Sequence, residues 1–281
     1  MAKQFRSSID ITTAPSSPKL ETHKLFDHTD NGFSGSPIDE FTRRLRALNS
    51  LAPTPAAFNS YLGQLVLLGA VAAVESYLRA AFRKSISCDP VCRESVMKRD
   101  ITYAAALHLH ADLLPEALLE RISFTSKDNI ENACRELLGI KGDFPISLQA
   151  AVKDYVRICH LRHCAVHRFG KLGASNAVHL GLDQHSMLLE KPLKLDYTSL
   201  QNAIAISTGF VRAFNGFLFN SLISRLPDDY FSGAYKDDRV RFIKYYSLFQ
   251  DKESINKSPT PKDVYVAYIK QREDFKRTAG R

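Results

Sequence analysis

Apolar residues recur every three to four positions along most of the chain, which is the pattern of amphipathic helices. A helix is predicted over residues 38–51. A longer helix is predicted from Thr54-Pro55 to about Ser87, because Thr is a favoured N-cap and Pro suits a first turn. The longer helix is expected to bury one face, made of Leu62, Leu65, Val66, Gly69, Ala73 and Leu78. Further helices are predicted over residues 90–112, 115–122, 126–138, 147–167, 197–224 and 262–275.

One segment between these helices shows a different period. Val178, Leu180 and Leu182 occupy alternate positions, and a second apolar run follows over residues 187–189. Alternation with a period of two is typical of strands, so this segment predicts a small β-hairpin. The fold class is therefore predicted to be all-α, with a helical bundle, a small β-hairpin and a helical carboxyl-terminal extension.

Composition divides the chain into three predicted parts. Residues 1–37 are rich in Ser, Thr, Pro, Asp and Gly without periodicity, and are expected to form a flexible arm. Residues 38–225 form the helical domain, and residues 226–281 a basic helical extension in which aromatic and basic residues alternate. That interleaving suits stacking on RNA bases, and it equally suits an amphipathic helical cap with a basic outer face.

The chain is expected to be a cytoplasmic protein that does not enter a membrane. Its longest apolar run, Leu62 to Val74, is shorter than the roughly 20 residues that span a bilayer, and no signal peptide is apparent. Five Cys without framework spacing predict reduced thiols, and no metal site or cofactor is expected. The net charge of +8 favours a polyanionic partner, although a merely soluble basic protein would carry it too.

The segment from Val156 to Lys171 concentrates the charge. It holds three Arg, three His and one Lys at the end of a predicted helix. Such crowding is unfavourable unless an anion compensates it, and Arg with His suits RNA cleavage because Arg binds phosphate and His exchanges protons near neutral pH. A simpler interpretation is that His167 and Arg168 only stabilise the helix end through its dipole. Arg157 could likewise pair with Asp154 or Glu75.

Two pairs in this segment have the spacing Arg-x4-His and Arg-x5-His, namely Arg162 with His167 and Arg157 with His163. A helix carrying Val74-Glu75-Ser76-Tyr77-Leu78 comes before them, several helices lie between, and a basic loop follows. Residues 58–225 thereby resemble the HEPN superfamily, whose signature is Arg-x(4–6)-His with a polar residue after the Arg. Here His163 takes the place of that polar residue.

The resemblance implies a HEPN-like bundle that acts as a metal-independent endoribonuclease, and as a homodimer with a composite cleft. His167 would act as general acid and base, Arg162 would bind the scissile phosphate, and His163 would share the proton transfer. The RNA backbone would be gathered by Arg157, Arg168 and Lys171, with Glu75 supporting the site. RNA would be cleaved to a 2′,3′-cyclic phosphate and a 5′-OH.

The resemblance also implies a setting in antiphage defence, toxin systems or stress responses, and leaves room for a regulatory or antitoxin partner. Some family toxins carry a Tyr two residues after the His that a partner enzyme modifies. Phe169 occupies that position here and has no hydroxyl, which excludes that modification.

Two alternatives to the nuclease remain open. A non-catalytic module could bind nucleic acid or a partner through the same cations, and a purely structural helical scaffold would do neither. Residues five apart lie about 140° from each other around an ideal helix. Arg162 and His167 therefore converge only if the helix ends near His167 or if a second chain completes the site.

Overall fold

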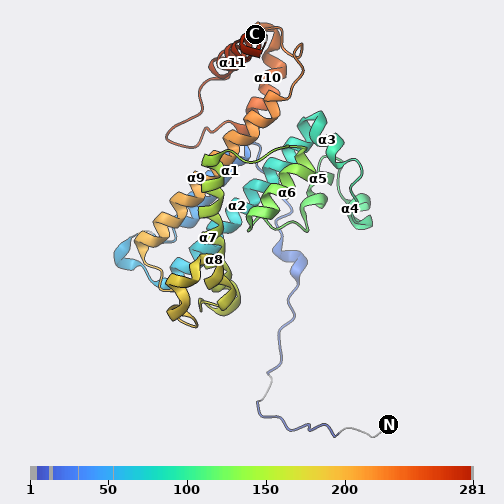
Figure 1. Cartoon of the computed structure of the whole chain (residues 1–281). Coiled ribbons are helices and arrows are strands. Elements are labelled where there is room, and N and C mark those ends of the chain that lie inside the picture. The colour runs from blue at the N-terminus through green and yellow to red at the C-terminus, as the bar shows by residue number, and fades with distance from the viewer. Residues whose placement is uncertain (1–4, 13–14, 31, 53, 280–281) are drawn as a thin grey trace. The chain divides into compact units, whose positions relative to one another are not determined.

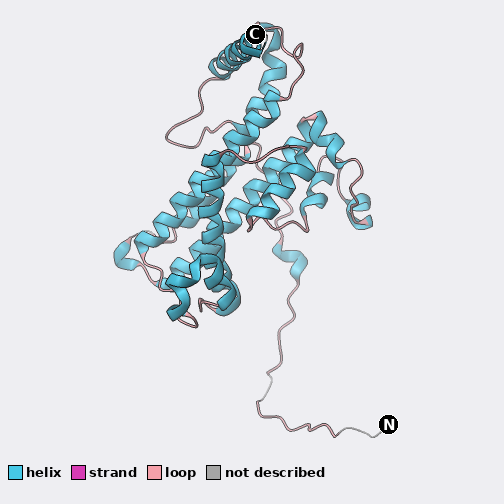
Figure 2. Cartoon of the chain, in the orientation of Figure 1, coloured by secondary structure: helices cyan, strands magenta, loops and turns pink. Residues whose placement is uncertain are grey.

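The computed structural model describes residues 5–12, 15–30, 32–52 and 54–279. The chain divides into two units, residues 1–34 and 35–281. Over the described residues the first unit contains one short 3₁₀ helix, η1 (Thr22–Leu25), and its side chains are mostly exposed. All eleven α-helices of the described ranges belong to the second unit, and those ranges contain no strand (Figures 1 and 2). The predicted all-α class is thus confirmed.

The second unit is built from helices of very different length. In chain order they are α1 (Pro37–Asn49), η2 (Pro55–Ala57), α2 (Ser60–Cys88), α3 (Pro90–Val96), α4 (Tyr103–His108), α5 (Leu114–Leu119), α6 (Lys127–Leu138), α7 (Ile146–Arg168), α8 (Ala174–His185), η3 (Ser186–Leu188), α9 (Tyr197–Ser224), α10 (Tyr235–Phe249) and α11 (Pro261–Ala279).

Helix α2 is the centre of the core, because it contacts α1, α3, α5, α6, α7, α9 and α10. Most of its predicted face is covered, with Val66, Ala73 and Leu78 buried, but Leu65 is 64% exposed. By length and composition α2 could span a membrane, since the helix extends well past the apolar run. The protein itself buries 61% of its most apolar window, as expected of a core helix.

Helices α7 and α9 pack against each other and against α2. Tyr155 of α7 stacks on Phe210 of α9 with ring centroids 4.6 Å apart, and Phe214 continues the aromatic cluster toward Phe82 of α2. These contacts anchor the first half of α7 in the core. Its second half extends beyond them toward α8 (Figure 1).

The β-hairpin prediction for residues 178–189 is wrong. Residues 174–185 form α8, residues 186–188 form η3, and in the described chain the only β-type pairing is an isolated bridge between Lys171 and Pro192. The alternating pattern has another cause. Gly181 adopts φ 108° and ψ 99°, which breaks the helical path between Leu180 and Leu182 and moves the second leucine out of register.

The carboxyl-terminal helices are attached through aromatic side chains. Phe242 and Tyr245 of α10 are buried, as is Tyr265 of α11, and α10 contacts both α9 and α2. The buried Asp238 accepts hydrogen bonds from the Tyr265 hydroxyl and from the Gly233 amide. These rings therefore belong to the core, which favours the interpretation of this region as an amphipathic cap.

Candidate functional site

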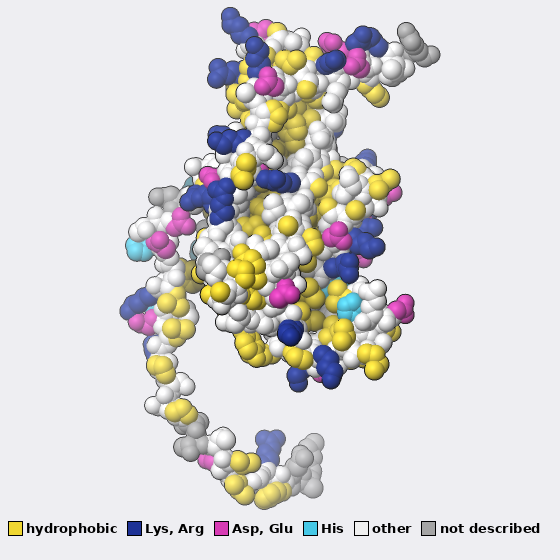
Figure 3. Space-filling view, turned by 90° about the vertical axis from the view of Figure 1, so that its left-hand side faces the viewer, with side chains coloured by type: hydrophobic (Ala, Val, Ile, Leu, Met, Phe, Trp, Pro, Cys, Tyr) yellow, Lys and Arg dark blue, Asp and Glu magenta, His cyan; other side chains and the backbone are white. Residues whose placement is uncertain are grey.

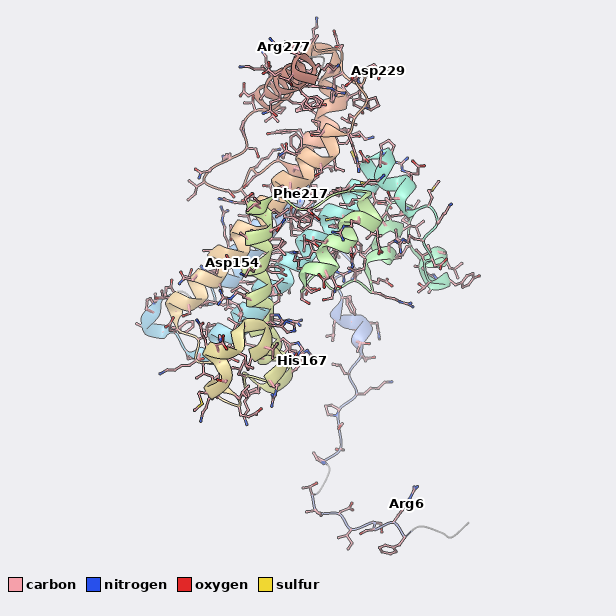
Figure 4. All side chains as sticks on the ribbon, in the orientation of Figure 1. Arg6, Asp154, His167, Phe217, Asp229 and Arg277 are labelled. Atoms are coloured by element: carbon pink, nitrogen blue, oxygen red, sulfur yellow. The ribbon has the colours of Figure 1, made fainter. Side chains whose placement is uncertain are left out.

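The Arg/His segment occupies the last turns of α7. Tyr155 and Cys159 hold the middle of the helix in the core, and the chain then continues helically to Arg168. Phe169 terminates the helix in the left-handed region with φ 51°, and the Gly170 amide donates to the Cys164 carbonyl at 3.0 Å. His167 thus lies at the exposed end of α7, well beyond Asp154 on the same helix (Figure 4).

The loop after α7 is held by an extended segment that follows η3. The Leu172 amide donates to the Lys191 carbonyl at 3.0 Å, and the Glu190 amide donates back to the Leu172 carbonyl at 3.0 Å. The Leu193 amide donates to the Gly170 carbonyl at 2.8 Å. Lys171, which forms the bridge, is exposed and has no side-chain ion pair among the described residues.

His163 and His167 lie one turn apart and their rings are 4.5 Å apart, tilted by 47°. Both side chains are exposed. Burial and the positive charges of His167 and Arg162 lower the pKa of His163. His163 is therefore mainly neutral near pH 7, with a nitrogen able to accept a proton.

Arg162 is half-buried and makes no hydrogen bond or ion pair with any described part of the chain. Burial raises the pKa of the Cys159 thiol, which is about 12 in the folded chain. The charge of Glu75 also raises this pKa, and the charge of Arg162 lowers it. Glu75 accepts a hydrogen bond from the Phe124 amide at 3.3 Å. Arg162 and Glu75 thus both act on the Cys159 thiol, and no ion pair joins them in the described chain.

One chain does not bring Arg162 and His167 together. Both residues are helical, since α7 ends at Arg168, one residue after His167, so the five-residue spacing still places the two side chains about 140° apart around its axis. Arg157 is exposed and forms no ion pair with Asp154 or Glu75, all three of which lie in the described part of the chain. Arg157 therefore stays available to an anion.

Arg168 is engaged by an acidic partner that sequence spacing could not reveal. Its Nη2 lies 2.7 and 2.9 Å from the two carboxylate oxygens of Glu190, which is 22 residues away. The guanidinium also lies against Gly173, where a Cβ would come within 2.7 Å of it. A phosphate would have to compete with Glu190 for this side chain.

A second histidine pair was missed by sequence reasoning. The ring of His160 stacks on that of His179 with centroids 4.6 Å apart and 10° between the planes, and its Nδ1 lies 3.1 Å from Asn176 Oδ1. Burial lowers the pKa of His160, and the charges of His179 and His163 lower it further. His179 and Asn176 belong to α8, which was not predicted as a helix, so no signal linked them to α7.

Exposed apolar side chains lie beside this site. The rings of Tyr61 and Phe169 are 5.8 Å apart, and Leu65, one turn after Tyr61 in α2, and Val166, in the last turn of α7 before Phe169, are exposed as well. Tyr61, Leu65 and Phe169 are 65%, 64% and 78% exposed, which makes this an open apolar surface. Figure 3 shows one face of the molecule, on which exposed hydrophobic side chains are interspersed with Lys and Arg.

The described residues contain no group of three or more His, Cys, Asp or Glu arranged to hold a metal ion. All five cysteines are free and buried. No protein-family model, curated protein or solved structure matches this chain.

Proposed function

We propose that the protein is a metal-independent endoribonuclease whose active site forms at the carboxyl end of α7. The observation that carries the proposal is the combination of Arg162, a cation with no acidic partner among the described residues, with two exposed histidines on adjacent turns. A cation for the phosphate and a neutral imidazole for the proton are the two groups that RNA cleavage requires.

The reaction follows from these groups. The imidazole of His167 removes the proton from the ribose 2′-OH, and the 2′-oxygen attacks the adjacent phosphorus. The bond between phosphorus and the 5′-oxygen breaks, and the leaving oxygen takes a proton from a protonated histidine. Arg162 stabilises the added negative charge on the phosphoryl oxygens. The proton that the leaving oxygen takes is the one removed from the 2′-OH, which His167 returns directly or through His163, whose lowered pKa makes it a ready donor once it is protonated.

A second copy of the chain completes the site in this proposal. Arg162 and His167 lie on different sides of α7, so they can act on one phosphate only if their partners come from another protomer. The open apolar surface of Tyr61, Leu65, Val166 and Phe169 adjoins the motif and is suited to such an association. The resemblance of residues 58–225 to the HEPN superfamily agrees with a dimer of this kind.

The test is cleavage of labelled single-stranded RNA in EDTA, with wild type beside Arg162→Ala and His167→Ala. Each variant is expected to lose cleavage by about 10²- to 10⁴-fold, because each removes a group that acts in the transition state. Arg121→Ala and His108→Ala serve as matched controls, since both side chains are exposed and lie outside the site. A substrate with a single 2′-deoxy position should resist cleavage at that position.

Mixing the two inactive variants tests the composite site directly. A dimer of one Arg162→Ala chain and one His167→Ala chain retains one complete pair if the groups act across the interface, so part of the activity should return. No recovery would contradict pairing between chains. Tight, salt-dependent RNA binding without cleavage by wild type would instead identify a non-catalytic module.

A further inference from the structure

A pocket of about 230 Å³ lies behind the site, between α7, α8, η3 and the extended segment 191–194. Its walls are largely apolar, formed by Leu161, Cys164, Leu172, Leu180, Leu188 and Leu193. Cys164 lies about 160° around α7 from Arg162, so this wall of the pocket is on the other side of the helix from the phosphate-binding arginine. None of the residues that line the pocket is assigned to the proposed nuclease site.

The charged groups of this pocket are all basic. Lys191, Lys194 and His185 line it, and none of its lining residues is Asp or Glu. Both lysines are exposed, and in the described chain neither forms an ion pair. The nearest acidic residue in sequence, Glu190, is already bound by Arg168. The pocket thus combines an apolar interior with uncompensated positive charge.

His185 adds a further group that can bind an anion. Its Nδ1 lies 2.8 Å from the Gly181 carbonyl and must carry the proton to donate to it. Its Nε2 is left for a ligand, and becomes a donor when the ring is protonated.

The backbone around the pocket is strained in a way that points to a role. Phe169 and Glu190 are the two non-glycine residues with positive φ in the described ranges, at 51° and 63°. Each comes directly before a residue that lines the pocket, Gly170 and Lys191 respectively. Residues held in this region cost free energy and concentrate at functional sites. Phe169 has this conformation because it ends α7, whereas Glu190 belongs to no helix and holds it directly beside the pocket.

We propose that this pocket binds an aliphatic monocarboxylate, with the chain in the leucine-lined interior and the carboxylate between Lys191 and Lys194. An apolar cavity of about 150 Å³ accommodates a six-carbon ring, so this volume corresponds to a chain of about eight or nine carbons. The site does not depend on the proposed nuclease function, and its test uses binding alone.

The first experiment is a calorimetric titration of the full chain with straight-chain carboxylates from hexanoate to dodecanoate. Affinity should rise by about fourfold for each added methylene and reach a plateau near nine carbons, where the pocket is full. Octylamine and 1-octanol should bind at least about tenfold more weakly than octanoate. A rise without a plateau, or equal binding of all three head groups, would overturn the proposal.

Matched variants locate the binding. Leu180→Trp fills the pocket and should abolish octanoate binding, whereas Val178→Trp on the exposed side of α8 should leave it unchanged. The double variant Lys191→Glu, Lys194→Glu should weaken octanoate binding by about tenfold. The double variant Lys141→Glu, Lys153→Glu makes the same change of charge outside the pocket and should leave binding unchanged. Leu65→Ser removes part of the open apolar surface, which lies outside the pocket, and should leave octanoate binding unchanged.

Circular dichroism of Leu180→Trp and of the double lysine variant confirms that each is folded, so that lost binding reports the pocket itself. Unchanged octanoate binding by folded Leu180→Trp would place the ligand elsewhere and overturn the proposal. RNA cleavage is measured in parallel. Cleavage without carboxylate binding would refute this site alone, and carboxylate binding without cleavage would leave it standing while refuting the nuclease.

Discussion

Two arginines near the carboxyl ends of long helices, Arg225 after α9 and Arg162 in α7, have opposite surroundings. Arg225 donates to the Leu138 carbonyl at 2.6 Å, to the Asp89 carboxylate and to the Cys92 sulfur at 2.9 Å. Arg162 meets no acceptor anywhere in the described residues. Through its two terminal nitrogens Arg225 joins α3, α6 and α9, although its Nε is buried without a hydrogen-bond partner, whereas the donors of Arg162 stay available to a group outside the described chain.

The same contrast extends to the groups around each arginine. Asp89 is 1% exposed, caps α3 through the Cys92 amide and accepts from the Tyr245 hydroxyl at 3.3 Å. Around Arg162 the neighbouring His163 and His167 are exposed and touch mainly each other. The buried network around Arg225 contributes to stability, whereas the exposed cluster around Arg162 is available for binding. Variants of the first should therefore change the free energy of unfolding, and variants of the second should change RNA binding and cleavage.

The largest expected effect on stability comes from opening the closed network. Arg225→Met leaves the buried Asp89 carboxylate without its cation, and should lower the free energy of unfolding by about 3–5 kcal/mol. Arg121→Met, at an exposed arginine outside the network, should change it by less than about 0.5 kcal/mol. Urea denaturation measures both. A loss below about 1 kcal/mol for Arg225→Met would contradict the structural role of this pair.

Two buried tyrosines refine the comparison at a smaller scale. The Tyr155 hydroxyl is fully buried near the Cys159 thiol without a hydrogen bond of normal geometry. Tyr155→Phe keeps the stacking on Phe210 and should raise the free energy of unfolding by about 1 kcal/mol. Tyr245→Phe removes a hydroxyl bonded to Asp89 and should lower it by about 1 kcal/mol. Urea denaturation measures both variants, and midpoints that shift in the same direction by the same amount would contradict this prediction.

Several features of the fold follow from short-range chemistry that the sequence displays. Asp196, a residue type favoured as N-cap, directly precedes the predicted helix over 197–224 and accepts from the Ser199 amide at 2.6 Å. Gly139 directly follows the predicted helix over 126–138 and adopts φ 63°, a conformation that favours glycine. At the start of that helix Ser126, the first residue of the predicted range, is the cap and accepts from the Asn129 amide.

Other features depend on contacts that no local pattern encodes. The predicted helix over 90–112 is split into α3 and α4, and the helix predicted from Thr54 begins only at Ser60, with Asn59 as its cap. In the site, the cluster on α7 could be predicted from sequence. The pairing of Arg168 with Glu190 and the stacking of His160 on His179 could not, because both depend on how α8 folds back on α7.

Arg168 is intermediate between Arg225, which is paired inside the protein, and Arg162, which has no acidic partner. It is paired with Glu190, but the pair is exposed at the surface. Glu190→Ala would free its guanidinium and should raise RNA affinity by up to about fivefold, the modest range of an exposed ion pair. Fluorescence anisotropy with labelled RNA measures the change, with Glu94→Ala as a charge-matched control at an exposed position. Reduced affinity for Glu190→Ala would show that the pair organises the loop.

The smallest effect concerns pH. Burial and neighbouring cations lower the pKa of His160 and of His163, so the unfolded chain takes up protons first as pH falls below the ordinary value of 6.5. The free energy of unfolding should therefore be constant above about pH 7 and decrease below 6.5. His160→Gln and His163→Gln should flatten this decrease in thermal melts at pH 5.5 and 7.5. An unchanged slope in both would contradict it.

The central position of α2 has a consequence for how the chain is made. Among the helices of the described chain that pack on α2, α1 is synthesised before it, whereas α9 and α10 lie more than a hundred residues downstream. At cellular rates of ~5–20 residues per second, the ribosome needs on the order of ten seconds to deliver them. During that interval α2 is an apolar helix of membrane-spanning length with most of its surface uncovered. We therefore expect nascent α2 to need cover, such as a chaperone gives, until α9 and α10 have been synthesised.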